Sequence, residues 1–288
     1  MGGLGGDEPH QGRGSLRLIL LGTGTSFGVP QIGCDCRTCT STDPKDRRTR
    51  SAAVVEANGR RLLIDTPPEL RLQLVQNGID DLDAVLFTHA HADHVHGIDD
   101  LRPISMRHKT GLPAYGSPAA IAELARRFDY IFDASVQPAP GTSIPRLAPL
   151  PIPAGAPIDI AGVAVLPLVL PHGDTVVYGY RIGPIAYLTD AKSVPDDVRA
   201  RLDGLEVLVL NALLPRPHPL HLSIPEAIAT ARAIGATRTI FTHLTHERTH
   251  AELVAEFPAG IEPGWDGMVV EAGSGIRGPG PGNALPDP

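Results

Sequence analysis

The chain has 288 residues with 25 basic and 32 acidic side chains, so its net charge is −7 and it lacks the general basic surface of a nucleic-acid binder. This length suits one large domain or two small ones. Its three cysteines cannot all pair with one another, which excludes a disulfide scaffold, whereas its 12 histidines favour an intracellular metal protein.

The sequence offers no segment typical of export or membrane insertion. Its start has no basic region followed by the apolar stretch of a secretory signal. No run of about 18 apolar residues occurs anywhere along the chain. We therefore expect a cytoplasmic protein that does not cross a membrane.

Glycine and proline are concentrated in three stretches of the chain. Residues 1–14 and 273–288 lack apolar periodicity, so we expect flexible tails on either side of a folded domain at 15–272. The third stretch, 137–157, is proline-rich and predicts a long loop or an irregular connection.

Short apolar runs bounded by turn residues predict strands, and apolar residues at helical spacing predict helices. The strands are expected at 16–21, 52–56, 61–64, 84–87, 163–168, 178–182, 186–188, 207–210, 239–241 and 268–271. The helices are expected at 68–76, 118–128, 195–202, 224–234 and 249–257. Because the strands come in clusters with a helix between clusters, the pattern favours a layered α/β fold with two sheets between helices.

A cluster of metal-binding residue types follows the strand expected at 84–87. His89 and His91 are two positions apart, so on an extended chain they point the same way. Asp93 and His94 follow as the chain turns toward a helix that we expect to begin near Ile98. Imidazole rings suit zinc, iron or manganese, and a carboxylate among them is typical of hydrolytic metal sites. The segment therefore predicts a metal centre.

The motif His89-x-His91-x-Asp93-His94 resembles the signature of the metallo-β-lactamase fold. Candidates for the other motifs of that family follow in chain order: Asp65, His172, Asp190 and His243. The resemblance spans residues 16–272 and implies an αββα sandwich, in which two β-sheets lie between helical layers, for the domain at 15–272.

The resemblance also implies a set of ligands for two divalent ions, zinc or manganese. One ion would be held by His89, His91 and His172, and the other by Asp93, His94 and His243, with Asp190 bridging both. Asp65 would orient a ligand without binding metal itself. Such a pair of ions supplies a hydroxide near neutral pH and offsets charge in the transition state, so the family's chemistry is hydrolysis by hydroxide attack.

The three cysteines form a second candidate metal site. Cys34, Cys36 and Cys39 form a C-x-C-x-x-C cluster, close enough to converge on one soft cation. A closed structural zinc site needs a fourth ligand, for which His246 is the candidate and His250 the second choice. The alternative is a redox-active or incidental cysteine trio.

The cysteine cluster, together with a His-x-x-His pair at His243 and His246, resembles one branch of the family. That branch contains the cyclic phosphodiesterase of bacterial phosphonate breakdown, which opens a cyclic phosphate on ribose 5-phosphate, and is related to ribonuclease Z. The resemblance implies a metal-dependent phosphodiesterase acting on a small, linear or cyclic phosphorylated substrate. Arg47, Arg48 and Arg50 either contact a second phosphate or form a solvated charged loop.

Hydrolysis of a phosphodiester also needs a proton for the departing oxygen. His221 precedes the helix expected at 224–234 and resembles a histidine that ribonuclease Z enzymes carry in a His-Ser-Thr setting, although Leu222 and Ser223 stand here in place of Ser and Thr. His218 is the alternative proton donor. We expect Asp93 and His221 to act directly in catalysis.

Two other functions stay open on the same fold. One is tRNA 3′ processing by a ribonuclease-Z-like endonuclease, against which the net charge of −7 argues. The other is a non-catalytic carrier resembling the B proteins of PQQ biosynthesis, against which the complete His/Asp set argues. The expected partner is thus a small phosphorylated molecule. Because dimers are common in the family, a homodimer is an open alternative to a monomer.

Overall fold

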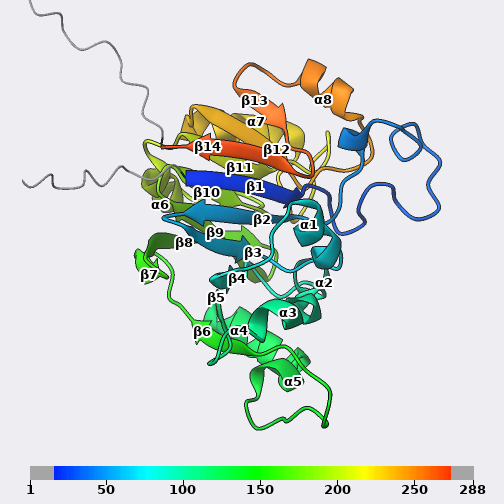
Figure 1. The fold of residues 1–288 in the computed structure, drawn as a ribbon. Coiled ribbons are helices and arrows are strands. Elements are labelled where there is room, and N and C mark those ends of the chain that lie inside the picture. The colour runs from blue at the N-terminus through cyan, green and yellow to red at the C-terminus, as the bar shows by residue number, and fades with distance from the viewer. Residues whose placement is uncertain (1–15, 274–288) are drawn as a thin grey trace, which may run out of the picture.

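The computed structural model describes residues 16–273, drawn in colour in Figure 1. The tails expected at 1–14 and 273–288 lie outside the described residues, apart from Gly273. The described chain forms two β-sheets with helices around them (Figure 1).

Each sheet has seven strands and is antiparallel in one part and parallel in the other. The first runs in the order β14 (Met268–Ala272), β1 (Leu16–Gly22), β2 (Ala52–Ala57), β3 (Arg60–Ile64), β4 (Ala84–Leu86), β5 (Leu112–Gly116) and β6 (Leu147–Pro151). The second runs in the order β13 (Ile261–Pro263), β12 (Arg238–Thr242), β11 (Val207–Asn211), β10 (Ile185–Leu188), β9 (Thr175–Ile182), β8 (Val163–His172) and β7 (Ile158–Ile160). The strands from β3 to β6 and from β10 to β13 are parallel.

Helices cover the outer face of both sheets. Those on the first sheet are α1 (Leu70–Gln76), α2 (Ala92–Val95), α3 (Arg102–Ser105), α4 (Pro118–Arg127) and α5 (Asp129–Phe132), and those on the second are α6 (Asp196–Arg199), α7 (Ile224–Ile234) and α8 (His250–Glu256). Short 3-10 turns lie at Pro44–Asp46, Ile98–Leu101 and Ala200–Leu202. Within residues 16–273, no helix is both long and apolar enough to cross a membrane.

Three apolar clusters hold these layers together. The first contains side chains from both sheets, such as Leu20, Val55, Tyr180 and Val209, and lies between them. The other two lie between each sheet and its own helices. Burial of apolar surface on both faces of both sheets is what the expected αββα sandwich requires, and this prediction of the fold is confirmed.

Local sequence signals explain where the long helices begin. Ser223 and Thr249 each accept a hydrogen bond from the backbone three residues later, in a capping box that begins α7 and α8. The Ser117 side chain also accepts from the backbone three residues later and so caps α4, without a capping box, and Pro118 is the first residue of the helix. The chain is already helical at α2, earlier than the expected start near Ile98, where a 3-10 turn lies instead.

The long loop or irregular connection expected at 137–157 is interrupted by β6, which the sequence did not predict, and is irregular on either side of it. Pro149 and Pro151 lie in this strand, where they weaken the sequence signal for β structure. The strand is nevertheless possible because β6 is the last in its sheet, so backbone groups on its free side need no partner strand. Strands β5, β7 and β13 were also absent from the expected set.

Candidate metal centre

Three side chains of the expected site follow the ends of parallel strands. Asp65 follows β3, Asp190 follows β10 and His243 follows β12 directly or within two residues. All three have left-handed backbone conformations, with φ of 64°, 55° and 58°, so the chain turns sharply where each parallel strand ends. Because carboxyl ends of parallel strands meet at one edge of a sheet, Asp190 and His243 come together at an edge of the second sheet. Asp65 belongs to the first sheet and reaches the same centre through His94, which contacts both Asp65 and Asp190.

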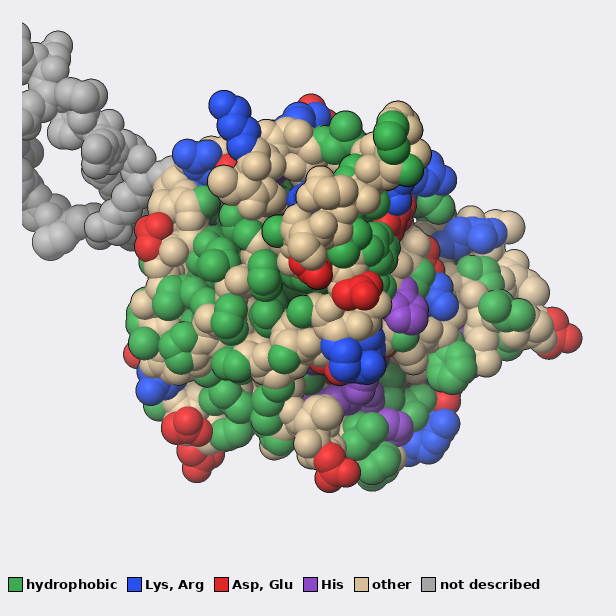
Figure 2. All heavy atoms as spheres, turned by 90° about the horizontal axis from the view of Figure 1, so that it is seen from below, with side chains coloured by type: hydrophobic (Ala, Val, Ile, Leu, Met, Phe, Trp, Pro, Cys, Tyr) green, Lys and Arg blue, Asp and Glu red, His purple; other side chains and the backbone are tan. Residues whose placement is uncertain are grey.

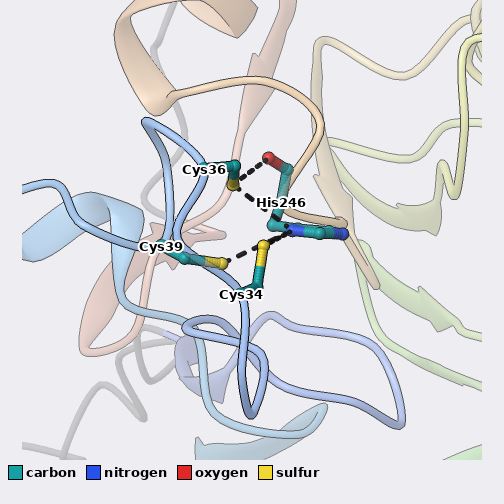
Figure 3. Close-up of side chains that lie close together, drawn as sticks. All are labelled: Cys34, Cys36, Cys39 and His246. Carbon is teal, nitrogen blue, oxygen red and sulfur yellow. Dashed lines mark hydrogen bonds between the residues drawn. The ribbon is translucent and has the colours of Figure 1, made fainter.

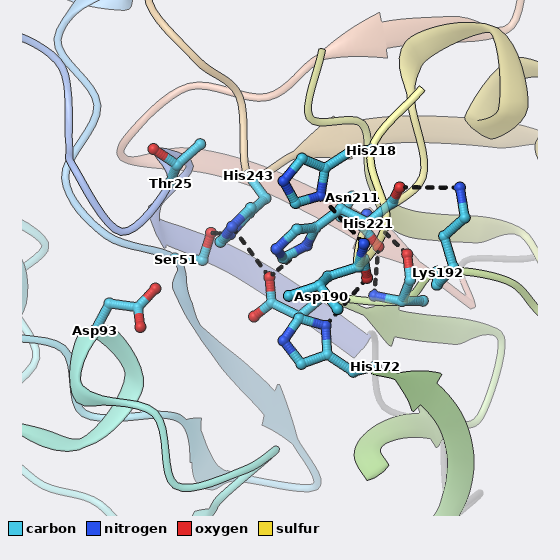
Figure 4. Close-up of polar contacts among 12 residues, drawn as sticks. Thr25, Ser51, Asp93, His172, Asp190, Lys192, Asn211, His218, His221 and His243 are labelled. Carbon is cyan, nitrogen blue, oxygen red and sulfur yellow. Dashed lines mark hydrogen bonds and ion pairs between the residues drawn. The ribbon is translucent and has the colours of Figure 1, made fainter. Parts of the chain in front are cut away.

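Asp190 lies at the centre of this group and is 1% exposed. Its Oδ2 lies 2.6 Å from Nε2 of His94 and 3.9 Å from Nε2 of His89. Its Oδ1 lies 3.1 Å from Nε2 of His243 and 3.4 Å from Nδ1 of His221. Figure 4 shows the carboxylate beside the rings of His221 and His243. One buried carboxylate therefore faces donors on both sides, as a bridging ligand must.

The seven expected ligands come together around that carboxylate. The ring nitrogens of His89, His91 and His172 lie within 4.8 Å of one another on one side. On the other side, Asp93 Oδ2 lies 3.4 Å from Nε2 of His94, and His243 groups with Asp190. His221 joins the second group at the same spacing, so it lies among the candidate ligands rather than apart from them.

The chemistry of these donors fits divalent cations. His89 Nε2, His94 Nε2 and both carboxylate oxygens of Asp190 are buried and make no hydrogen bond. Buried polar atoms without partners cost free energy, and lone pairs that face one another also repel. A cation between them removes both costs. Burial opposes ionisation of the Asp190 carboxyl, but the neighbouring His243 and His94 hold its pKa well below the usual value. The group is therefore an anion, which is the form that binds a cation.

Neighbouring groups fix which nitrogen of each ring faces the centre. Asp65 is fully buried and accepts hydrogen bonds from the backbone and hydroxyl of Thr88, both at 2.8 Å, and from Nδ1 of His94 at 2.7 Å. His172 donates from Nδ1 to the carbonyl of Leu220 at 3.1 Å. In both rings Nε2 is left to face the centre. Asp65 does this for His94, as expected of it, and the carbonyl of Leu220 does it for His172.

The cysteines form a separate cluster with His246, shown in Figure 3. Nδ1 of His246 lies 3.2 Å from the sulfur of Cys34 and 3.4 Å from the sulfurs of Cys36 and Cys39. A tetrahedral zinc site places sulfur and nitrogen ligands about 3.6 Å apart, so these four atoms fit one zinc ion. A hydrogen bond from the Cys39 backbone lowers the pKa of Cys36 to about 6, which favours its thiolate.

The second-choice zinc ligand does not reach this cluster. His250 lies instead against Arg48, with 3.4 Å between Nδ1 and Nη2, and its ring packs on Trp265. Arg48 is itself 1% exposed and donates to the hydroxyl of Thr23 at 3.0 Å. The expectation that Arg48 belongs to a solvated loop or contacts a phosphate is therefore wrong. Through these buried contacts, Arg48 attaches the segment before β2 to the rest of the domain.

The two candidate proton donors lie at different depths. The ring of His221 stacks on His243, with centroids 4.9 Å apart and planes inclined by 22°. Burial and the neighbouring His243 lower the pKa of His221 to about 3. His218 is partly exposed, 5.1 Å from the ring of His221, and its Nδ1 accepts from the backbone of Leu220. His221 is thus the candidate at the centre and His218 at its rim.

Some residues that position the site had no part in the sequence predictions. Thr88 connects Asp65 to the strand end, and its hydroxyl also lies 3.0 Å from Nδ1 of His89. Asn211 accepts from the backbone of Ala191 at 2.8 Å and donates to its carbonyl at 3.1 Å, which holds the turn after Asp190. A polar residue at the end of an otherwise apolar strand is the signal that could have identified Asn211.

Two cavities open beside the metal centre. One, of about 310 Å³, is lined by His221 and His243. The other, of about 460 Å³, is lined by His89 and His91. Figure 2 shows histidine side chains reaching the surface of this face, with hydrophobic side chains beside them. The centre is therefore accessible from two sides.

Comparison with known proteins gives one family match. The model of the family described as the beta-lactamase superfamily domain matches residues 60–244, which include every expected ligand of the two-metal centre.

Solved structures similar to this one include a diphosphatase and a PqqB protein. A diphosphatase from the PhnP family is 38% identical, with a TM-score of 0.83, and the match covers 90% of this chain and 98% of that one. Zinc-bound PqqB from Methylobacterium extorquens is 21% identical, with a TM-score of 0.70 and coverage of 88% and 99%. The second likeness shows the fold alone.

A curated relative matches over only part of its length. An octanoyltransferase of Porphyromonas gingivalis is 39% identical over 256 residues, which are 88% of this chain and 51% of that protein. The chain therefore spans about half the length of this relative.

Proposed function

Because the chain belongs to the beta-lactamase superfamily, as a metallo-β-lactamase-fold hydrolase of the PhnP branch, we propose that it is a metal-dependent phosphodiesterase for a small phosphorylated molecule. The observation that carries the proposal is the buried Asp190 carboxylate, whose two oxygens make no hydrogen bond but face imidazole nitrogens on both sides. The similarity to a diphosphatase supports phosphoryl chemistry, because both reactions break a P–O bond of a substituted phosphate.

The proposal assigns the donors to two divalent ions and a structural zinc ion. His89, His91 and His172 would hold one ion, Asp93, His94 and His243 would hold the other, and Asp190 would serve both. Cys34, Cys36, Cys39 and His246 would hold the structural zinc. Two ions in the first set would lower the pKa of a coordinated water and offset negative charge on the phosphoryl oxygens.

The side chains of the protein supply orientation and a proton. Asp65 and the carbonyl of Leu220 hold the imidazoles of His94 and His172 with Nε2 toward the centre. In our proposal, His221 gives a proton to the departing oxygen. Its pKa of about 3 keeps the ring neutral alone, but an anionic phosphate bound beside it raises that pKa, because negative charge favours imidazolium.

Replacing His221 tests its role as proton donor. We expect His221→Gln to lower the hydrolysis rate of diphenyl phosphate about 100-fold, and that of bis(p-nitrophenyl) phosphate much less, because p-nitrophenolate departs without needing a proton. His218→Gln, the control at the rim, should change both rates little. Equal losses on both esters, together with loss of bound metal, would instead make His221 a metal ligand.

A substrate panel tests the proposed reaction. Protein loaded with zinc or manganese should hydrolyse bis(p-nitrophenyl) phosphate faster than p-nitrophenyl phosphate, an octanoyl thioester or a β-lactam. Preference for the thioester or the lactam would contradict the proposal, and inactivity on every member would favour the non-catalytic carrier. Cleavage of precursor tRNA, with affinity that falls steeply as salt rises, would favour the ribonuclease-Z-like alternative.

A further inference from the structure

The cavity beside His221 contains an exposed aromatic side chain that the proposed reaction does not use. Phe27 lines this cavity together with Leu213 and Leu214, and its own exposed fraction is 66%. Exposed apolar residues are common one at a time, but this ring lies on the wall of a cavity that reaches the metal centre. In this position, the Phe27 ring is available to contact a ligand bound in the cavity.

The loop holds Phe27 in place. The backbone of Gly28 donates to the carbonyl of Thr25 at 2.9 Å, and the backbone of Phe27 donates to the Thr25 hydroxyl at 3.3 Å. Gly28 has a φ of 66°, which a residue with a side chain rarely adopts, so glycine allows this tight turn. Thr25, at the base of the turn, lies near His243 in Figure 4. The ring is thus presented by an ordered turn at the edge of the reacting centre.

The charges around the cavity disfavour a second phosphate. Among the described residues that line it, none is Lys or Arg. Its one carboxylate, Glu247, is paired with Arg216 through both oxygens at 2.8 Å. Gln31 and Ser26 add neutral polar groups to the wall. An aromatic face with polar groups at its edge suits a flat, uncharged ring that carries hydrogen-bonding atoms, which is the chemistry of a nucleobase.

The position of the cavity also indicates which part of the substrate binds in it. His221 and His243 line this cavity, whereas His89 and His91 line the other. Since His221 is the proposed proton donor for the departing oxygen, the group beside Phe27 is the one that leaves. The two substituents of a linear diester then occupy opposite sides of Asp190.

We propose that the substrate is a linear phosphodiester whose departing alcohol is a nucleoside, with its base stacked on Phe27. The inference rests on the proposed phosphodiesterase function. Water supplies the oxygen that bonds to phosphorus. The P–O bond to the nucleoside breaks, its electron pair stays on the nucleoside oxygen, and that oxygen takes up a proton. The products are a nucleoside and the phosphate monoester of the other alcohol.

The experiment compares two esters with the same reacting bond. Adenosine 5′-methyl phosphate carries a base and ribose 5-methyl phosphate does not. For the wild type, we expect kcat/KM to be about tenfold higher for the adenosine ester, since a base–aromatic stack contributes about this much. The products should be adenosine and methyl phosphate, not AMP and methanol.

Substitutions in the loop distinguish an effect of the Phe27 ring from a general effect of changing the loop. Phe27→Ala should remove the preference for the adenosine ester, and Phe27→Trp should retain it. Ile32→Ala is the matched control, because Ile32 lies in the same loop and is 95% exposed but is not among the residues that line the cavity. Calorimetry should show adenosine binding to the wild type and to Ile32→Ala, and weaker binding to Phe27→Ala.

The outcomes distinguish this inference from the proposed function. Hydrolysis of both esters at equal rates, unchanged by Phe27→Ala, would overturn the nucleoside assignment and leave the phosphodiesterase intact. Release of AMP and methanol would overturn the assignment of the leaving side. Adenosine binding that depends on Phe27, without hydrolysis of any diester, would support the cavity and contradict the phosphodiesterase.

Discussion

Asp190→Asn is expected to lower kcat/KM for bis(p-nitrophenyl) phosphate by about 10³-fold. Asn preserves the size of the side chain and tolerates the left-handed backbone at this position, where φ is 55°. It removes the charge that the surrounding imidazoles face, and a carboxamide is a weak metal ligand. The loss is therefore electrostatic and not a result of unfolding. Metal analysis should find fewer ions per chain than in the wild type.

The control for this prediction is Asp196→Asn, which makes the same chemical change at the surface. Asp196 pairs with Arg199 and its side chain is 89% exposed, so its loss should leave both activity and metal content unchanged. If Asp190→Asn kept wild-type activity with both ions bound, Asp190 would not be the bridging residue. The assignment of the centre would then be wrong.

Cys36→Ser should remove one zinc ion per chain and lower the free energy of unfolding by about 3 kcal/mol or more, because loss of a structural metal belongs to the most destabilising class of changes. The cluster joins the loop between β1 and β2 to His246, which follows β12 in the other sheet. Without the metal, this connection between the two halves of the fold is lost. Denaturant unfolding and metal analysis measure the two effects.

Asp35→Asn is the matched control for the zinc site. Asp35 is exposed and lies between two of the cysteines, so its change alters the same loop without removing a sulfur. It should retain three ions per chain and wild-type stability. A Cys36→Ser protein with the same zinc content and the same unfolding midpoint as the wild type would contradict the structural-zinc proposal.

Much of the architecture could be predicted because local signals agree with the final fold. The helix expected at 224–234 has these same bounds in the structure, since Ser223 and Glu226 form a capping box and Gly235 ends it. The strands β5 and β6 could not be predicted as easily, because Pro113, Pro149 and Pro151 lie within them. Their pairing depends on neighbours far away in the sequence.

The candidate site, too, could be predicted from the sequence only in part. The cluster from His89 to His94 is visible as a local pattern of metal-binding residue types. Asp190 and His243 join the same hypothesis through the resemblance to the motifs of the metallo-β-lactamase fold. The environments of Arg48 and Phe27 depend on contacts that no local pattern records: Arg48 is buried against Thr23, and Phe27 faces a cavity. Charge and hydrophobicity alone predict the opposite exposure for both residues.

The most direct test of the account is a titration of metal-depleted protein with zinc or manganese, followed by the rate of bis(p-nitrophenyl) phosphate hydrolysis. Once the Cys-His cluster holds its zinc, the rate should rise with added metal and level off at two further equivalents per chain. The Asp190→Asn protein should stay near the background rate throughout. A wild-type rate that does not depend on metal, or that stays at background with two equivalents bound, would contradict the proposed two-metal phosphodiesterase.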